Sequence, residues 1–220
     1  MAMQFVLGSR SPRRRELLES FIGAERLLVR PPADSDEEGF DHLHDNASIR
    51  ERLKHIVRVK MEDVGTQIQS EFAASANTVC CVTADTVVVA ADSQHGLVVL
   101  GQPRQPSWQV DVRDWMLHLY SATTHEVWTA FQVKYGEQIY EEIVVSKVRF
   151  CELTPAMVER YIATGESIGK AGGYAVQGAA AAFVEGIDGS LTNIIGLPVT
   201  EVLRAMEFMA LNIGLPEETA

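Results

Sequence analysis

Apolar residues in the N-terminal third of the chain follow first a strand-like and then a helix-like pattern. Residues 5–7 form a short apolar run that predicts a strand ending at Gly8, and the Ser-Pro pair that follows predicts a helix over 13–20. A second short strand is predicted over 27–30, where two prolines stop it. Residues 47–74 lack proline, and their apolar side chains recur at three- and four-residue steps, which predicts one long amphipathic helix.

The rest of the chain predicts a β-rich centre followed by helices and loops. The apolar segment 78–84 predicts a buried strand that runs into Asp85, and β-branched residues continue over 86–91. Residues 125–134 and 138–150 predict a hairpin. Further strands are expected over 97–100 and 181–186, helices over 107–119, 154–164 and 198–212, and a glycine-rich loop over 169–178. These elements are typical of one mixed α/β unit that spans residues 1–220.

Asp85 interrupts the most apolar strand of the chain. A carboxylate in such a place is costly to bury unless it is paired, hydrogen-bonded or bound to a metal. Catalytic carboxylates sit at strand ends, so Asp85 is a candidate for catalysis. The structural alternative is an aspartate that caps a turn between two strands.

The composition, with 46% hydrophobic and 22% charged residues among 220, is that of an ordinary globular chain. No run reaches the ~18 uncharged apolar residues that a membrane span needs, and the apolar stretch before Arg10 is too short for a signal peptide. We therefore expect a cytoplasmic protein without a membrane partner. Cys80, Cys81 and Cys151 fit neither a disulfide framework nor zinc-ligand spacing, so we expect reduced, mostly buried thiols.

The formal charge of −11 argues against a nucleic-acid polymer as partner. Four arginines nevertheless fall within residues 10–15, and an acidic stretch follows at 34–45. The two segments either are solvated surface runs or together bind a polyanion with a divalent metal. Arginines at a helix start, preceded by Ser9 and Ser11, would combine N–H groups, hydroxyls and guanidinium groups into a phosphate cradle. The same residues are also common capping chemistry on a surface helix.

Several segments in combination make the chain resemble the Maf family of nucleoside triphosphate pyrophosphatases. They are LGSRSPRRRELL at 7–18, ADSDEE at 33–38, VRVK at 57–60, TADTVVV at 83–89, LGQP at 100–103, HEVWTA at 125–130, KVRFCELT at 147–154, YIATGESIGKAGGYAVQG at 161–178 and NIIGLPVTEV at 193–202. The resemblance implies hydrolysis between the α and β phosphates with a divalent cation, Mg²⁺ or Mn²⁺. It also implies an inosine-triphosphatase-like α/β fold, with a mixed twisted sheet and flanking helices in two lobes around a central cleft.

The family's site residues can be carried onto this sequence position by position. They fall at Ser9, Arg13, Arg14, Glu37, Lys60, Asp85, Lys170 and Gln177. The resemblance makes Asp85 the catalytic aspartate, and we take it as the general base and, with Glu37, as a metal ligand. Arg13, Lys60 and Lys170 are then the cations for the departing pyrophosphate.

Thr86, Lys170 and Gln177 look like the family's pyrimidine branch, which acts on dTTP and UTP. Arg13, Thr86 and Gln177 are the positions expected to contact or select the base. The amide of Gln177 can meet both a donor and an acceptor on a uracil edge.

Two departures from the family pattern bear on turnover. Gln102, a substrate-contact position, stands where the family's LGKP motif has lysine, and Gly169 stands where aspartate usually precedes Lys-Ala-Gly. Loss of a charge-assisted hydrogen bond at position 102 would cost about 5- to 150-fold, unless Arg104 compensates.

The histidines carry less chemistry. His125 at a strand start is more often structural, and His42 and His44 lack further ligands at metal spacing and are expected on the surface.

Three functional readings follow. The first is an active metal-dependent pyrophosphatase, with a homodimer possible by analogy. The second is a nucleotide-binding Maf-type regulator of septum formation and cell division with little turnover. The third is a family member that acts on another nucleotide.

Overall fold

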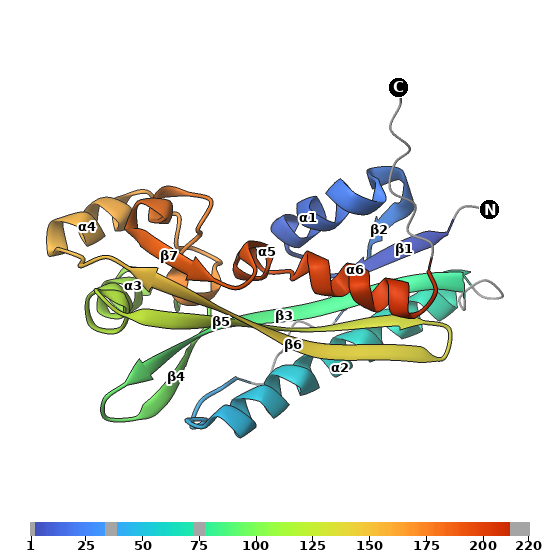
Figure 1. Ribbon diagram of the computed structural model, residues 1–220, viewed down its shortest axis with the longest axis horizontal. Helices are drawn as coiled ribbons and strands as arrows, with labels where there is room; N and C mark the ends of the chain where they lie inside the picture. The colour runs from blue at the N-terminus through green and yellow to red at the C-terminus, as the bar shows by residue number, and fades with distance from the viewer. Residues whose placement is uncertain (1–2, 34–38, 73–77, 212–220) are drawn as a thin grey trace.

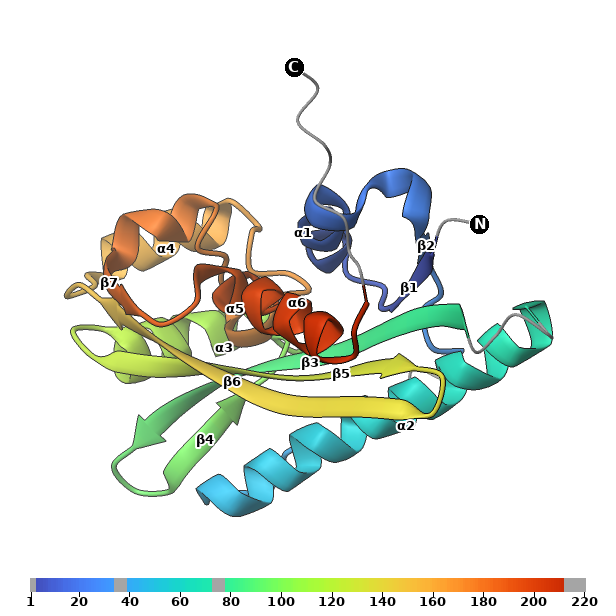
Figure 2. The ribbon, with the colours of Figure 1, turned by 45° about the vertical axis from the view of Figure 1, so that its right-hand side comes forward.

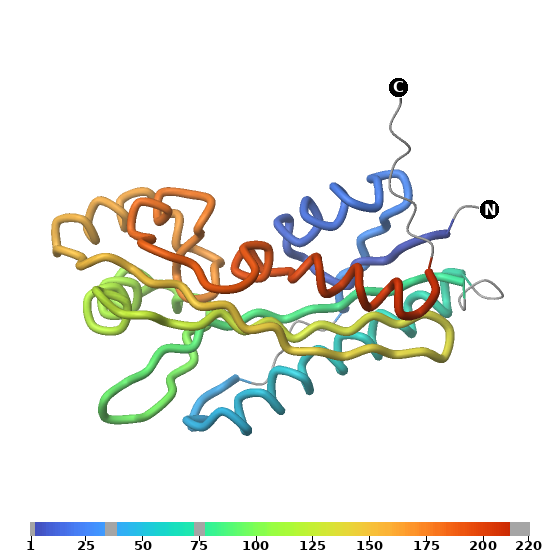
Figure 3. The backbone as a smooth tube through the Cα atoms, in the orientation of Figure 1, coloured from blue at the N-terminus to red at the C-terminus, as the bar shows by residue number. Residues whose placement is uncertain are grey.

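The computed structural model describes residues 3–33, 39–72 and 78–211. Within these ranges one seven-stranded mixed sheet has the order β2-β1-β3-β5-β6-β7, with β4 beside the second half of β3 (Figure 1). The strands are β1 Gln4–Gly8, β2 Leu27–Val29, β3 Val79–Asp92, β4 Gly96–Leu100, β5 Thr124–Tyr135, β6 Gln138–Phe150 and β7 Val184–Asp188. β5 and β6 form the predicted hairpin, which runs along most of the molecule (Figure 3).

Helices cover both faces of this sheet. The α-helices are α1 Pro12–Ile22, α2 Asn46–Phe72, α3 Trp108–Asp114, α4 Pro155–Ala163, α5 Leu191–Ile195 and α6 Val199–Phe208. Shorter turns are the 3-10 helices η1 Ala24–Arg26, η4 Ala171–Gly173 and η5 Ala179–Phe183, and the π-helical turn η3 Trp115–Tyr120. Figure 2 shows α2 along one face and α1 and α6 on the other. None of the helices in the described ranges is long and apolar enough to cross a lipid bilayer.

The core lies on both sides of the sheet because residues alternate along β3. Cys80 and Val82 pack with α1 and α6, whereas Val79 and Cys81 pack against α2. Cys80 and Cys81 are buried as predicted, Cys151 is half-buried, and all three thiols are free. Burial raises the pKa of Cys80 and of Cys81, so both side chains stay protonated.

The predicted mixed α/β fold with two lobes is confirmed. One lobe holds α1, β1, β2 and α6, the other holds β4, α3, α4 and β7, and β3, β5 and β6 run through both (Figure 1). On one side of β3, pairing with β1 extends as far as Thr83 and pairing with β4 begins at Val88, while β5 covers the opposite side. Residues 84–87 therefore present an edge without a strand partner among the described strands.

Asp85 lies within β3 and not at its end. Its position is opposite Ala130 in the ladder with β5, so the prediction of a strand end or a capped turn was wrong. The physical reason is the β-branched sequence on both sides of Asp85, which favours a continuous strand. The Asp85 side chain projects from the face of the sheet that α2 covers.

Smaller differences lie in the second half of the chain. The helix predicted over 107–119 starts as α3 and changes to the π-helical turn η3 at Trp115. The segment predicted as a strand over 181–186 begins as η5, because its alanines have low β propensity, and the strand starts at Val184. The short helix α5 was not predicted, and the closing helix α6 ends at Phe208.

Candidate active site

A cavity of about 820 Å³ opens at the free edge of β3. Its size is within the range of pockets that hold small ligands. Every predicted site residue that the structure describes lines it: Ser9, Arg13, Arg14, Lys60, Asp85, Thr86, Gln102, Lys170 and Gln177. Glu37 lies outside the described residues, although Pro32 and Gly39, which flank residues 34–38 in the described chain, both line the cavity.

The turn from β1 into α1 forms one wall of the cavity. Ser9 is buried at the end of β1, and its Oγ accepts a hydrogen bond from the Ser11 N–H at 3.2 Å. Ser11 caps α1 by accepting from the Arg14 N–H at 3.4 Å, and Pro12 occupies the first turn, as predicted. The first turn of α1 therefore presents its positive end to the cavity. Arg13 lines the cavity there and forms no hydrogen bond or ion pair with a described residue.

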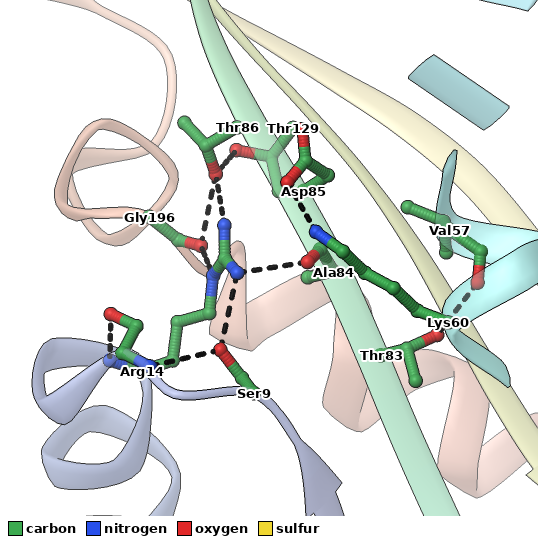
Figure 4. A network of polar contacts seen from close by, with 11 residues as sticks. Ser9, Arg14, Val57, Lys60, Thr83, Ala84, Asp85, Thr86, Thr129 and Gly196 are labelled. Carbon is green, nitrogen blue, oxygen red and sulfur yellow. Dashed lines mark hydrogen bonds and ion pairs between the residues drawn. The ribbon is translucent and has the colours of Figure 1, made fainter. Parts of the chain in front are cut away.

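Arg14 lines the same wall, but its guanidinium group binds protein acceptors (Figure 4). Nη1 donates to Ser9 Oγ at 3.2 Å and to the Ala84 carbonyl at 2.8 Å. Nη2 donates to Thr86 Oγ1 at 3.0 Å, and Nε donates to the Gly196 carbonyl at 2.8 Å. Arg14 therefore holds together the end of β1, the free edge of β3 and the junction between α5 and α6. Its direct contact with phosphate stays a prediction.

Thr86 and Asp85 approach the cavity from opposite faces of the sheet. Thr86 faces α5, where its Oγ1 lies 2.9 Å from Thr129 Oγ1 and donates to the Gly196 carbonyl at 3.1 Å. The Thr86 hydroxyl is thus held among protein groups, and its contact with a base also stays a prediction. Asp85 faces α2.

Lys60 and Asp85 form an ion pair at the edge of the cavity. Lys60 Nζ donates to Asp85 Oδ1 at 2.6 Å, with the two side chains 12% and 14% exposed. The helix is fixed beside β3 because Thr83 Oγ1 donates to the Val57 carbonyl at 3.3 Å, one turn before Lys60 (Figure 4). Among the described residues that line the cavity, Asp85 has the only acidic side chain.

Lys170 comes from the glycine-rich loop. Its ammonium donates a hydrogen bond to the Glu166 carbonyl oxygen. Burial and the nearby charge of Arg13 lower the pKa of Lys170, whereas Glu166 opposes the shift. Gly169 has a φ of +70°, a left-handed conformation that glycine adopts without strain. With no carboxylate at position 169, a main-chain carbonyl holds the Lys170 ammonium.

Gln102 and Gln177 are exposed at the rim of the cavity. The loops that carry them are joined by a hydrogen bond of 2.9 Å from the Gly172 N–H to the Gly101 carbonyl. Arg104 does not line the cavity, because its guanidinium group pairs with Asp111 at 2.6 Å. It therefore does not replace the missing lysine at position 102.

His125 lies behind the cavity wall. Burial lowers its pKa to about 3, and its Nε2 lies 2.7 Å from the hydroxyl of Tyr174, which lines the cavity. This placement agrees with the structural interpretation of His125. His42 and His44 are exposed, and the described part of the chain holds no cluster of His, Cys, Asp or Glu suited to a metal ion.

Some residues that line the cavity were not predicted as site residues. Phe40, Tyr174, Ile194 and Gly196 belong to the cavity wall although no charge or spacing marked them individually. Gly196 has a φ of +128° between α5 and α6. A glycine between two short helical patterns was the signal that could have found this corner.

Comparison with known proteins decides the family. The family model described as "Maf-like protein" matches residues 4–209. The chain belongs to the Maf family. A relative from Polaromonas sp. that is 33% identical over 213 residues, covering 96% of this chain and 99% of its own, is named "dTTP/UTP pyrophosphatase". The same name is carried by a 37% identical protein from Anaeromyxobacter sp., covering 94% and 89%, and by a 31% identical protein from Pyrococcus furiosus, covering 93% and 94%.

The divalent cation that the Maf family implies can be tested against the residues present. Mg²⁺ takes oxygen ligands and is usually held by one or two carboxylates together with waters and substrate phosphates. Asp85 Oδ1 accepts from Lys60, while Oδ2 makes no hydrogen bond to a described residue. The side chain therefore fits as one oxygen ligand at the cavity wall. Glu37, the second predicted ligand, lies outside the described residues.

Proposed function

We propose that this chain is a metal-dependent nucleoside triphosphate pyrophosphatase. It cleaves dTTP, UTP or related modified pyrimidine nucleotides between the α and β phosphates, giving the monophosphate and pyrophosphate. The observation that carries the proposal is the convergence of motifs from distant parts of the chain on one cavity. Five cationic residues and one carboxylate line it: Arg10, Arg13, Arg14, Lys60, Lys170 and Asp85. The names of the Polaromonas, Anaeromyxobacter and Pyrococcus relatives support the same reaction and substrate class.

The lining residues supply a proton acceptor and cations that bind phosphate. Asp85 accepts a proton from the attacking water, since its Oδ2 makes no hydrogen bond to a described residue. Lys60 orients the carboxylate through its hydrogen bond to Oδ1. Arg13 and Lys170, which both line the cavity, bind the leaving pyrophosphate. A divalent cation held by Asp85 and Glu37 would neutralise phosphate oxygens when bound.

Base selection is assigned to the rim and the inner wall. Gln177 is exposed at the rim, where its amide can donate to and accept from a pyrimidine edge. Thr86 and Arg13 complete this proposed selection. The neutral Gln102 and the outward pairing of Arg104 favour a second candidate, a nucleotide-binding regulator of septum formation with little turnover.

The test is pyrophosphate release by the wild type and by Asp85→Asn. The substrates are the common nucleoside triphosphates, 5-methyl-UTP, pseudo-UTP and 7-methyl-GTP, each with Mg²⁺, Mn²⁺ or EDTA. We expect metal-dependent release that favours dTTP or UTP, and a loss of about 10²- to 10⁴-fold in Asp85→Asn, the usual size of a general-base contribution.

Asp114→Asn is the matched control, because Asp114 is an exposed aspartate on α3 that does not line the cavity. Thermal unfolding shows whether each variant is folded. Folded wild type that releases no pyrophosphate from any substrate but binds nucleotide would replace the enzyme with the regulator. Preference for a purine nucleotide would refute the pyrimidine assignment alone.

A further inference from the structure

Glu166 lies at the base of the loop that brings Lys170 and Gln177 to the cavity. It follows α4, and the loop 167–178 runs from it to the start of η5 at Ala179. Glu166 itself does not line the cavity. Its contacts nevertheless reach both ends of the loop.

The Glu166 carboxylate joins these two ends directly. Oε2 accepts from the Ala179 N–H at 2.8 Å, and Oε1 accepts from the Ala180 N–H at 3.4 Å. Oε1 also accepts from the Tyr161 hydroxyl on α4 at 3.1 Å. Hydrogen bonds to an ionised acceptor are stronger than neutral ones, so one side chain closes a loop whose ends are 13 residues apart.

The backbone leaves room for this contact at Gly178. A Cβ atom at that position would lie 1.9 Å from Glu166 Oε2, closer than any two such atoms can approach. The carboxylate thus packs directly against the main chain next to Gln177. The position of the Glu166 carboxylate therefore requires a residue without a Cβ atom at position 178.

Glu166 also holds Lys170 through its main chain. The Glu166 carbonyl accepts from the Lys170 ammonium, so the side chain and the main chain of one residue restrain both functional groups of the loop. The middle of the loop is tied to the second lobe by two tyrosines. Tyr120 donates to the Gly172 carbonyl at 3.0 Å. The Tyr161 hydroxyl lies 3.1 Å from both Glu166 Oε1 and the Gly173 carbonyl, so its single proton is shared between these two acceptors.

We propose that Glu166 is a positioning residue for the triphosphate site, whose carboxylate closes the loop 167–178 and thereby holds Lys170 and Gln177 at the cavity wall. The assignment of Lys170 to phosphate rests on the proposed function, whereas the closure of the loop by the Glu166 carboxylate is independent of it. Because Lys170 would contact phosphate in both the bound substrate and the transition state, its displacement raises KM more than it lowers kcat.

The experiment compares Glu166→Ala with Glu159→Ala in the full chain. Glu159 is an exposed glutamate on α4 that pairs with Arg113 and does not line the cavity. In Glu166→Ala we expect faster hydrogen exchange of the Ala179 and Ala180 amides, a KM for dTTP or UTP raised tenfold or more, and a kcat changed less than threefold. In Glu159→Ala we expect wild-type values for all three. Binding of inorganic triphosphate, followed by calorimetry, should weaken in parallel with KM.

Two milder variants keep the proposal testable if Glu166→Ala does not fold. Glu166→Gln retains one acceptor oxygen without the charge, and Tyr161→Phe removes one donor to the carboxylate; both should shift exchange and KM in the same direction by smaller factors. Unchanged exchange and unchanged KM in Glu166→Ala would overturn the proposal, and so would a loss confined to kcat. If the wild type releases no pyrophosphate, the enzyme proposal fails, and amide exchange with triphosphate binding still decides the role of Glu166.

Discussion

Replacement of Arg14 tests whether its side chain stabilises the fold or binds phosphate. Its guanidinium group donates to Ser9 Oγ, Thr86 Oγ1 and the carbonyls of Ala84 and Gly196. These acceptors belong to the turn between β1 and α1, to β3 and to the α5–α6 junction, so the side chain connects three parts of the site (Figure 4). Arg14→Ala should therefore reduce the stability of the fold as well as activity.

The expected loss follows from which acceptors keep a second donor. Ser9 Oγ retains the Ser11 N–H, and the Gly196 carbonyl retains the Thr86 hydroxyl. The Ala84 carbonyl lies on the edge of β3 that has no strand partner among the described strands, and Arg14 Nη1 donates to it at 2.8 Å. A hydrogen bond to a charged donor contributes about 1.5–3 kcal/mol, and one to two such bonds are lost without replacement. Arg14→Ala should therefore lower the free energy of unfolding by about 1.5–6 kcal/mol.

Arg14→Lys and Arg15→Ala complete the series. Lysine keeps the charge, but a single ammonium cannot span acceptors that the planar guanidinium reaches together, so we expect roughly half of the loss. Arg15 is the neighbouring arginine, with a side chain 57% exposed and paired with Glu19 on the surface of α1. Removal of this exposed pair should cost about 0–1 kcal/mol.

The assay is urea unfolding of the four proteins, followed by KM and kcat with dTTP or UTP. The brace predicts a stability loss in the order Arg14→Ala, Arg14→Lys, Arg15→Ala, with activity recovering in part for the lysine variant. Stability of Arg14→Ala within 0.5 kcal/mol of the wild type, together with a KM raised more than about 100-fold, would refute this reasoning. Arg14 would then act as a phosphate ligand.

Three further predictions concern the rim, the buried histidine and the thiols. Gln102→Lys should raise kcat/KM by about 5- to 150-fold, since it adds a cation at the cavity rim, whereas Gln109→Lys on the exposed surface of α3 should leave it unchanged. Because burial holds the folded-state pKa of His125 at about 3, only the unfolded chain binds this proton between that value and about pH 6.5. The free energy of unfolding should therefore fall as the pH drops below about 6.5, by up to about 1.4 kcal/mol per pH unit from this group. In urea titrations at several pH values, His125→Phe should reduce this pH dependence. The control variant His55→Gln, at an exposed histidine, should leave it unchanged. A thiol reagent should modify Cys151 alone in the native protein and all three cysteines after unfolding, and rapid native labelling of either buried thiol would contradict its burial.

Local patterns in the sequence accounted for most of the fold, whereas the resemblance to the Maf family supplied most of the predicted residues that line the cavity. The spacing of apolar residues along 47–74 predicted α2, and Ser11-Pro12 predicted the start of α1. Lys60 shows how the periodicity of a helix can also place a side chain at the site. It follows Val57 by three residues and precedes Val64 by four, so it borders the buried stripe of α2 and must reach toward the sheet. A cation in that register is placed by the same periodicity that packs the helix.

The position of Asp85 could not be predicted, because it depends on pairing between strands far apart in the sequence. Alternation and β propensity describe β3 alone and do not say that its pairing with β1 stops at Thr83 or that its pairing with β4 begins at Val88. The cavity that Asp85 lines opens at the unpaired edge of residues 84–87, between these two pairings. The bond from Arg14 to Gly196 spans 182 residues and is equally invisible to a local pattern.

The charge of the cavity shows how an acidic protein can attract a polyanion. Arg14 binds neutral protein oxygens and Lys60 binds Asp85, so both cations are held by groups that shape the site. Arg13 and Lys170 form no ion pair with a described residue, and they lie close enough for Arg13 to lower the pKa of Lys170. Their mutual repulsion weakens when a phosphate chain enters between them, so each favours binding beyond its own contact. The net charge of −11 acts over long distances that salt screens, whereas these two cations act at contact distance inside the cavity.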